Sequence, residues 1–208
     1  LASFIEAGVS DYPAEHYAVV LWNHGAPWTG MGPDESNGSD ILDLAEINAG
    51  FTEGLARAGL DSIDLIGFDA CLMASYEVAT TVADHGDFML ASEELEPGHL
   101  VDNPEYSAVD LGQAIIDGFV GQAQVNNTEE EITLSLLDLR VMGSVEQALD
   151  QLAQPLMANP IAAAPILAQA RTASLTFGSN PDPTLDSHQI DLGNLVQHLG
   201  NADSLLVV

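Results

Sequence analysis

The chain has 208 residues, of which 47% are hydrophobic, so it is long enough to bury a full core as one domain or slightly more. Its 32 acidic residues face only three arginines and no lysine, and the resulting net charge of −29 excludes nucleic acid and anionic lipid surfaces as expected partners. No apolar run reaches the roughly 20 residues that cross a bilayer, so we expect no membrane span.

The distribution of the acids indicates the kind of surface that the protein has, and the cysteine count bears on its redox compartment. The acids are dispersed, which favours a solvated surface, such as that of a protein adapted to high salt, over an acidic face that binds a partner. One cysteine permits no internal disulfide and leaves the redox compartment open. Because the chain opens on Leu1 without an initiator methionine, we expect a piece of a longer protein, truncated at the N-terminus.

The first predicted element is a strand. Residues 14–25, "AEHYAVVLWNHG", are apolar, contain β-branched and aromatic residues, and stop at Gly25. The segment that follows, residues 25–40, is rich in Gly, Pro, Asn and Ser and is predicted to be a loop.

A helix is predicted next, over residues 43–59. Its apolar side chains recur at helical spacing, and Asp43 and Glu46 stand where a capping box needs them. Gly59 is a residue typical of the position after a helix end, so we expect the helix to stop there.

Strands and helices continue to alternate along the middle of the chain. We expect a strand at 62–68, a helix at 74–86 that ends at its last glycine, and a strand at 87–94. An amphipathic helix at 107–124 and a fourth strand at 132–139 follow.

The last third of the chain is predicted to be mainly helical. Residues 144–171 read as a helix broken near Pro155 and Pro160, and a loop then leads to a short helix at about 191–199.

The alternation of strands and helices predicts the fold class. Strands joined by helical crossovers form a mostly parallel sheet, so we expect a three-layer α/β/α sandwich. Residues 1–140 would form its core, and residues 141–208 a helical C-terminal part of the same domain or the start of an accessory region.

The ends of two predicted strands carry residues suited to nucleophilic chemistry. In an open α/β sheet, ligands bind beyond the carboxyl ends of the strands, where "NHG", "DAC" and "SEELEPGH" follow the first three strands. His24 and Cys71 lie on strands joined by one crossover, so we expect them to be neighbours and to form a thiol and its proton acceptor. A buried, inert cysteine and a loop histidine are the alternative on residue types alone.

Other ligand patterns are weak. None of the other histidines has metal-ligand spacing with Cys71, so we expect no metal site of that kind. No strand is followed by a phosphate-binding glycine motif. The segment "DESNGSD" at 34–40 carries oxygen ligands without the alternation of a calcium loop, which leaves calcium open.

The segments around these strand ends resemble a known family. "YAVVLWNHGAPW" and "IDLIGFDACLMASYEVA", followed by "ASEELEPGH", are similar to the clostripain family of cysteine peptidases, which belongs to the structural clan of caspases, gingipains and legumains. The similarity runs in one order across residues 12–140, and "HQIDLGNLVQHL" near the end also resembles a family segment. The resemblance implies a caspase-like fold for the core.

The resemblance also implies roles at the first two strand ends. Cys71 would be the nucleophile and His24 the general acid and base of peptide-bond hydrolysis through an acyl thioester. The backbone N–H groups of Gly25 and Cys71 would form the oxyanion hole. A helix that begins near Ala74 would direct its positive end toward the thiolate.

Substrate selection would involve three further residues. By the resemblance, Asp69 lies near the primary specificity pocket, where a carboxylate favours arginine or lysine at the cleaved position. Ser92 and Glu93 would line a wall of that pocket. A turn or helix-capping acid is the structural alternative for Asp69.

Two stretches depart from the family pattern. The loop after the histidine is usually glycine-rich, whereas here Ala26 and Pro27 precede Trp28, and "GHLVDNPEYS" replaces the usual Gly-Trp after the third strand. The second departure puts the outer substrate subsites in doubt.

The sequence and the resemblance together predict a cysteine endopeptidase that acts on peptides or proteins and requires no cofactor. The resemblance implies that it is secreted or on the cell surface. A peptidase relative that only binds a partner, and a hydrolase or transferase acting on another acyl group, are the alternatives. The oligomeric state and the physiological substrate are left open.

Overall fold

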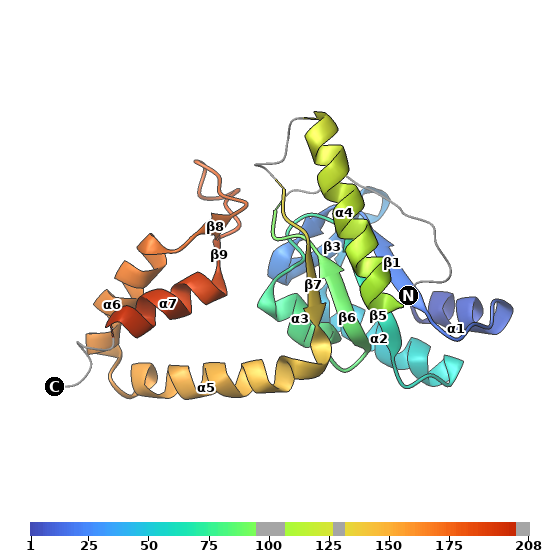
Figure 1. Cartoon of the computed structure of the whole chain (residues 1–208), viewed down its shortest axis with the longest axis horizontal. Helices are drawn as coiled ribbons and strands as arrows, with labels where there is room; N and C mark the ends of the chain where they lie inside the picture. The colour runs from blue at the N-terminus through green and yellow to red at the C-terminus, as the bar shows by residue number, and fades with distance from the viewer. Residues whose placement is uncertain (95–106, 127–131, 203–208) are drawn as a thin grey trace. The chain divides into compact units, whose positions relative to one another are not determined.

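The chain folds into two compact units, residues 1–142 and residues 143–208, in a computed structural model that describes residues 1–94, 107–126 and 132–202 (Figure 1). The first carries every residue that the sequence predicts to be functional. None of the helices among the described residues is both long and apolar enough to cross a bilayer.

A four-stranded sheet forms the centre of the first unit. Its strands are β1 (Ala18–Trp22), β5 (Ile63–Asp69), β6 (Gly86–Ala91) and β7 (Ser135–Asp138), in the order β1-β5-β6-β7. The first three run parallel, and β7 pairs antiparallel with β6 at the edge. The predicted α/β class with a mostly parallel sheet is confirmed.

Helices cover both faces of this sheet. The helices of the first unit are α1 (Ala2–Asp11), α2 (Leu44–Ala58), α3 (Tyr76–Val82) and α4 (Ala108–Asn126). The crossovers that contain α2 and α3 lie on one face, where the two helices contact each other and α1 packs against α2. The helix α4 crosses the other face and contacts β5, β6 and β7 (Figure 1).

The central strand β5 is buried on both faces. Ile63, Leu65, Ile66 and Phe68 are all at most 2% exposed, which is typical of a parallel strand covered by helices on either side. Each such side chain contributes about 1.5–3 kcal/mol of hydrophobic stabilisation relative to an exposed one. This buried strand ends at Asp69, so it places Asp69 and Cys71 at the carboxyl end of the parallel strands.

The caps of α2 confirm the prediction from its sequence. The Asp43 carboxylate accepts a hydrogen bond from the N–H of Glu46 at 2.8 Å, and the Glu46 carboxylate accepts one from the N–H of Asp43 at 3.1 Å. Gly59 follows the helix in the left-handed region, with φ of 70°.

The segment predicted to be a loop over residues 25–40 contains a small antiparallel sheet instead. Its strands are β2 (Gly25–Ala26), β3 (Gly30–Asp34) and β4 (Asp40–Leu42). The prediction was wrong because strands this short, with glycine and proline in β3, show no alternation of apolar and polar residues.

Two other boundaries differ from expectation. The helix predicted at 74–86 is only the seven-residue α3, which ends at Val82. It begins at Tyr76 because Ser75 caps it by accepting a hydrogen bond from the N–H of Val78 at 3.2 Å. Gly86 does not end this helix but begins β6.

The second unit is mainly helical. Its elements are α5 (Met142–Ala158, whose first residue still belongs to the first unit), α6 (Pro160–Ala173), β8 (Thr176–Phe177), β9 (Gln189–Ile190) and α7 (Leu192–Ala202). The helix breaks at Asn159, which caps α6, and not at Pro155, which lies inside α5. The pair β8 and β9 was not predicted, because two-residue strands carry no periodic signal.

Candidate active site

The strands β1 and β5 end side by side at one edge of the sheet. Trp22 pairs with Asp69 in the parallel register, and the N–H of Asn23 donates to the Asp69 carbonyl at 3.4 Å. His24 follows β1 and Cys71 follows β5, so the structure brings the two predicted reactive segments to neighbouring strand ends, as the single crossover predicted.

The backbone of Gly25 touches the peptide group of Cys71. A β-carbon on Gly25 would overlap the Cys71 carbonyl oxygen and would lie 3.0 Å from both its carbonyl carbon and Met73 Cγ. Real β-carbons do not approach other atoms this closely, so only glycine lets the two strand ends meet here. The segment of His24 is thereby held against the segment of the cysteine.

The backbone of His24 is fixed from both sides. Its N–H donates to Asn23 Oδ1 at 2.7 Å, and its carbonyl accepts from the N–H of Gly32 at 2.9 Å. The small sheet of β2, β3 and β4 therefore anchors the histidine at the sheet edge, while its side chain is exposed to solvent. An exposed imidazole can exchange protons with a bound substrate.

The loop after β5 has an unusual backbone. Cys71 is half-buried, and the next residue, Leu72, has φ of 64°, in the left-handed region that leucine seldom occupies. The N–H of Leu72 donates to the Glu94 carbonyl at 3.1 Å, and the N–H of Ala74 donates to the Ser92 carbonyl at 2.9 Å. The loop is thus tied to the segment that leaves β6.

The helix predicted to point at the thiolate does not begin where expected. The first helical residue of α3 is Tyr76 and not Ala74, and the helix has seven residues. Two turns of helix carry a small dipole, so α3 is a weak source of positive potential for Cys71.

The remaining predicted residues lie in two places. Asp69 is the last residue of β5 and is half-buried, beside the cysteine loop. Ser92 is 0% exposed, and its hydroxyl donates to the Glu94 carbonyl at 3.1 Å, so its side chain lies inside its own loop. Glu93 is half-buried, and its carboxylate accepts a hydrogen bond from Ser135 Oγ at 2.7 Å.

Thr133 and Ser135 are contacts of this site that the sequence did not reveal. The N–H of Glu93 donates to Thr133 Oγ1 at 3.0 Å. These partners are about 40 positions apart along the chain and meet only through the antiparallel pairing of β6 with β7, which no local pattern reports. The residues that follow Glu94 in the "SEELEPGH" motif lie outside the described residues.

The acidic segment at 34–40 forms a turn. Hydrogen bonds from the Ser36 side chain, the Asn37 side chain and the Ser36 N–H lower the pKa of the Asp34 carboxyl. Across the described ranges, His, Cys, Asp and Glu side chains nowhere gather in a group of three or more that could hold a metal ion.

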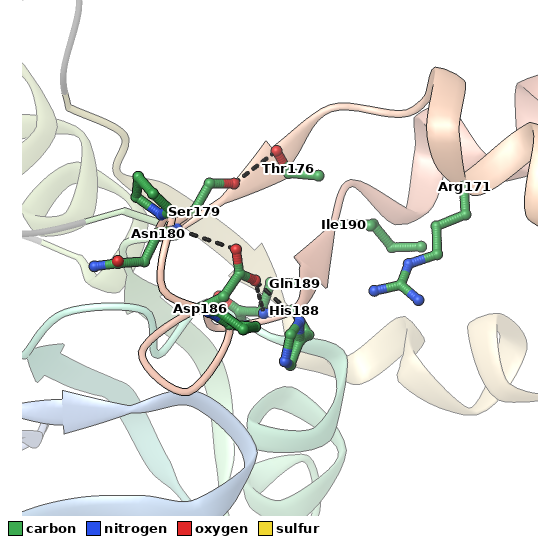
Figure 2. A pocket seen from close by; sticks show the side chains of 10 residues that line it. Arg171, Thr176, Ser179, Asn180, Asp186, His188, Gln189 and Ile190 are labelled. Carbon is green, nitrogen blue, oxygen red and sulfur yellow. Dashed lines mark hydrogen bonds and ion pairs between the residues drawn. The ribbon is translucent and has the colours of Figure 1, made fainter.

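A separate pocket of about 220 Å³ lies in the second unit (Figure 2). Asp186 stands in it with a pKa lowered by hydrogen bonds from the N–H groups of Asn180 and His188, and its carboxylate lies 3.1 Å from His188 Nδ1. The other lining residues include Arg171, Thr176 and Ser179. None of the predicted site residues lies there.

Comparison with known proteins identifies the relatives of this chain. The sequence model of the clostripain family matches residues 1–199. Clostripain of Hathewaya histolytica is 32% identical over 93 residues, and the match covers 38% of this chain and 16% of that protein.

Two solved structures share the fold. An inactive zymogen of a C11 protease from Parabacteroides distasonis is 17% identical, with a TM-score of 0.60, and the match covers 98% of this chain and 57% of that one. A secreted C11 cysteine protease from Bacteroides thetaiotaomicron, in complex with an irreversible peptide inhibitor, is 19% identical with a TM-score of 0.58, covering 99% and 59%. The chain thus spans less than two thirds of these relatives.

Proposed function

The chain belongs to the clostripain family of cysteine peptidases, and we propose that it hydrolyses peptide bonds with Cys71 as the nucleophile and His24 as the general acid and base. The observation that carries the proposal is the contact between Gly25 and the Cys71 peptide group. It places the only cysteine of the chain beside the segment that holds the histidine.

The proposed reaction has two steps. The imidazole of His24 takes the thiol proton, the Cys71 sulfur attacks the substrate carbonyl carbon, and the leaving amine receives the proton as the peptide bond breaks. Water then hydrolyses the acyl thioester and releases the new carboxyl end. The N–H groups of Gly25 and Cys71 stabilise the oxyanion of each tetrahedral intermediate.

The proposed specificity is for arginine or lysine at the cleaved position. Asp69 ends the strand that delivers the cysteine, and its half-buried position suits a carboxylate that binds a guanidinium or ammonium group. Glu93 adds a second half-buried carboxylate on the segment tied to the cysteine loop. Ser92 would line the pocket through its backbone, since its side chain is buried.

The proposal extends to the location of the protein and to its cofactor requirement. A secreted relative supports a secreted or cell-surface location for this protein. The proposed dyad needs no cofactor, so a chelator should leave the cleavage rate unchanged. Restoration of a chelator-sensitive rate by calcium would assign a calcium role instead.

The second candidate is a peptidase relative that binds a partner without cleaving it. The indole rings of Trp22 and Trp28, on either side of His24 in the sequence, are 75% and 59% exposed, and a bound protein would cover them. Such a protein would show no turnover on any peptide.

The test compares variants on a fluorogenic arginyl peptide. Cys71→Ala and His24→Ala should abolish cleavage, while His198→Ala, which removes a histidine from the second unit, should not change it. Undiminished cleavage by Cys71→Ala would overturn the proposal. Cleavage of non-peptide esters alone would assign another acyl substrate.

A panel with arginine, lysine, asparagine or aspartate at the cleaved position tests the specificity separately. Wild type should cleave the first two, and Asp69→Ala should lose that preference. Equal wild-type rates on all four peptides would remove the role of Asp69 and leave the dyad intact.

A further inference from the structure

The left-handed backbone of Leu72 needs an external constraint. A β-branched or bulky side chain is unfavourable at a φ of 64°, so the loop after Cys71 would relax to another conformation if nothing held it. Between the described residues, two backbone hydrogen bonds hold it, from Leu72 to the Glu94 carbonyl at 3.1 Å and from Ala74 to the Ser92 carbonyl at 2.9 Å. Both acceptors belong to residues 92–94, which continue from the end of β6.

The segment at residues 92–94 is itself held by Thr133. The antiparallel register pairs Ala91 with Ser135, and two residues further Thr133 lies opposite Glu93. Thr133 Oγ1 accepts the N–H of Glu93 at 3.0 Å and lies 3.2 Å from Ser92 Oγ. A single hydroxyl therefore contacts two consecutive residues of the segment.

The hydroxyls of Ser92 and Thr133 can make all of these hydrogen bonds in only one arrangement of their protons. Ser92 Oγ donates to the Glu94 carbonyl at 3.1 Å and accepts the N–H of Glu94 at 3.0 Å, which leaves it one acceptor site. The Thr133 hydroxyl must then donate to Ser92 while it accepts from Glu93. Because Ser92 is fully buried, losing that donor removes one of the three hydrogen bonds of its hydroxyl with no water to replace it.

We propose that Thr133 is a positioning residue for Cys71. Its hydroxyl fixes residues 92–94, these fix the backbone of Leu72, and the Leu72 backbone aims the thiol of the preceding residue at His24. The inference rests on the proposed function, in which Cys71 is the nucleophile. Small shifts of the thiol matter, since a displacement of a reacting group by about 1 Å can lower a reaction rate by about a hundredfold.

The test removes the hydroxyl and then restores it. Thr133→Val keeps the shape of the side chain without the hydroxyl, and Thr133→Ser keeps the hydroxyl. Thr172→Val is the matched control, because its hydroxyl bonds to the Ala168 carbonyl within α6 of the second unit. The first readout is the rate at which iodoacetamide alkylates the protein, which reports on Cys71 alone as the single cysteine.

Thr133→Val should lower the alkylation rate and kcat by about tenfold or more while KM changes little, and it should shift the acidic limb of the pH–rate profile. Thr133→Ser should restore wild-type values, and Thr172→Val should match wild type. Should Thr133→Val not fold, Ser92→Ala deletes the other hydroxyl of the pair and should slow alkylation in the same way.

The possible results distinguish failure of the positioning role of Thr133 from failure of the proposed peptidase function. Wild-type alkylation and kcat in a folded Thr133→Val protein, or in Ser92→Ala where Thr133→Val does not fold, would overturn the positioning role. Failure of Thr133→Ser to rescue a slowed Thr133→Val protein would also overturn it, because the effect would then come from packing. Continued cleavage by Cys71→Ala would instead remove the proposed function beneath it.

Discussion

Gly25 contacts the peptide group of Cys71 so closely that no side chain fits between them. The close approach joins the loop of β2 to the loop after β5, and it depends on one missing methyl group. The N–H of Gly25 is also a proposed hydrogen-bond donor to the oxyanion. Both the close approach of the two strand ends and the stabilisation of the oxyanion therefore depend on Gly25.

We predict that Gly25→Ala lowers cleavage by about a hundredfold, because the β-carbon must push the two strand ends apart. The same overlap should lower the free energy of unfolding by about 1–3 kcal/mol. Peptide cleavage and urea unfolding measure the two effects. Gly8→Ala in α1 is the control, since no atom lies within 4 Å of its added methyl group, and it should be neutral or stabilising. A fully active Gly25→Ala protein would contradict the close approach.

His85, the last residue of the crossover from β5 to β6, makes the stability of the fold depend on pH. It is 7% exposed, its Nε2 lies 2.7 Å from Asn48 Oδ1, and its ring stacks on Phe51 at 5.8 Å. Burial lowers the pKa of His85 below its ordinary value of 6.5, and Asp84 opposes that shift. The folded state therefore favours the neutral ring.

The unfolded chain then binds more protons than the folded chain in mild acid. The stabilisation from a neutral His85 is complete above pH 6.5 and is lost as the pH falls below that value. We predict that wild type loses more unfolding free energy between pH 7.5 and pH 5.5 than His85→Gln, which cannot titrate. Urea titrations at both pH values measure the difference, and equal losses would contradict the assignment.

At the scale of elements, the packing of α1 on α2 depends on two glycines of α2. A β-carbon on Gly50 would lie 2.9 Å from Leu1 Cβ, and one on Gly54 would lie 3.0 Å from Ile5 Cβ and 3.2 Å from Ala2 Cα. Glycine costs about 1 kcal/mol inside a helix, so its presence here reflects close contact between the helices. Ile5 is the buried residue of α1 in this contact.

We predict that Gly54→Val lowers the free energy of unfolding by about 1–3 kcal/mol, because the new side chain forces α1 away from α2. Urea unfolding followed by circular dichroism measures the change. Gly121→Ala in α4 is the matched control, since nothing lies within 4 Å of its added methyl group, and it should gain up to about 1 kcal/mol. A Gly54→Val protein as stable as wild type would show that α1 does not pack as described.

The elements that the sequence predicted well are those with local signals. Asp43, Glu46 and Gly59 mark the ends of α2, and the apolar run of β5 marks a strand buried on both faces. The strand-end rule likewise predicted that the segments of His24 and Cys71 follow neighbouring strands. Each of these signals lies within a few residues of the element that it predicts.

Several of the elements that were missed depend on distant partners. The strands β2, β8 and β9 have two residues each, so only their pairing defines them. Thr133 becomes part of the site only because β7 runs antiparallel to β6, which the sequence between the two strands does not state. The left-handed backbone of Leu72 is likewise imposed by hydrogen bonds to Ser92 and Glu94 and by no feature of leucine.

At the scale of the whole molecule, the dominant feature is unbalanced charge. Within the described part of the chain, two arginines pair with acids: Arg57 lies 2.6 Å from Glu53 and 3.4 Å from Glu6, and Arg140 lies 2.7 Å from Asp138. These pairs are exposed, and exposed pairs contribute little. Three arginines are too few to offset 32 acids, and folding brings the acids closer together than in the extended chain.

Salt should therefore stabilise the fold. The screening length falls from about 30 Å at 0.01 M salt to about 3 Å at 1 M, so repulsion between dispersed carboxylates is removed while the buried core is unaffected. We predict that the urea midpoint of unfolding rises steadily from 0.01 M to 1 M NaCl, with the steepest rise at the low end, where screening changes most. Urea is the denaturant of choice because guanidinium chloride is itself a salt. Sucrose at equal osmolality is the control, since it acts by exclusion from the surface without screening charge and should not reproduce the rise below 0.2 M. A midpoint that stays level or falls across this range would mean that the few ion pairs of the arginines and histidines outweigh the repulsion of 32 acids.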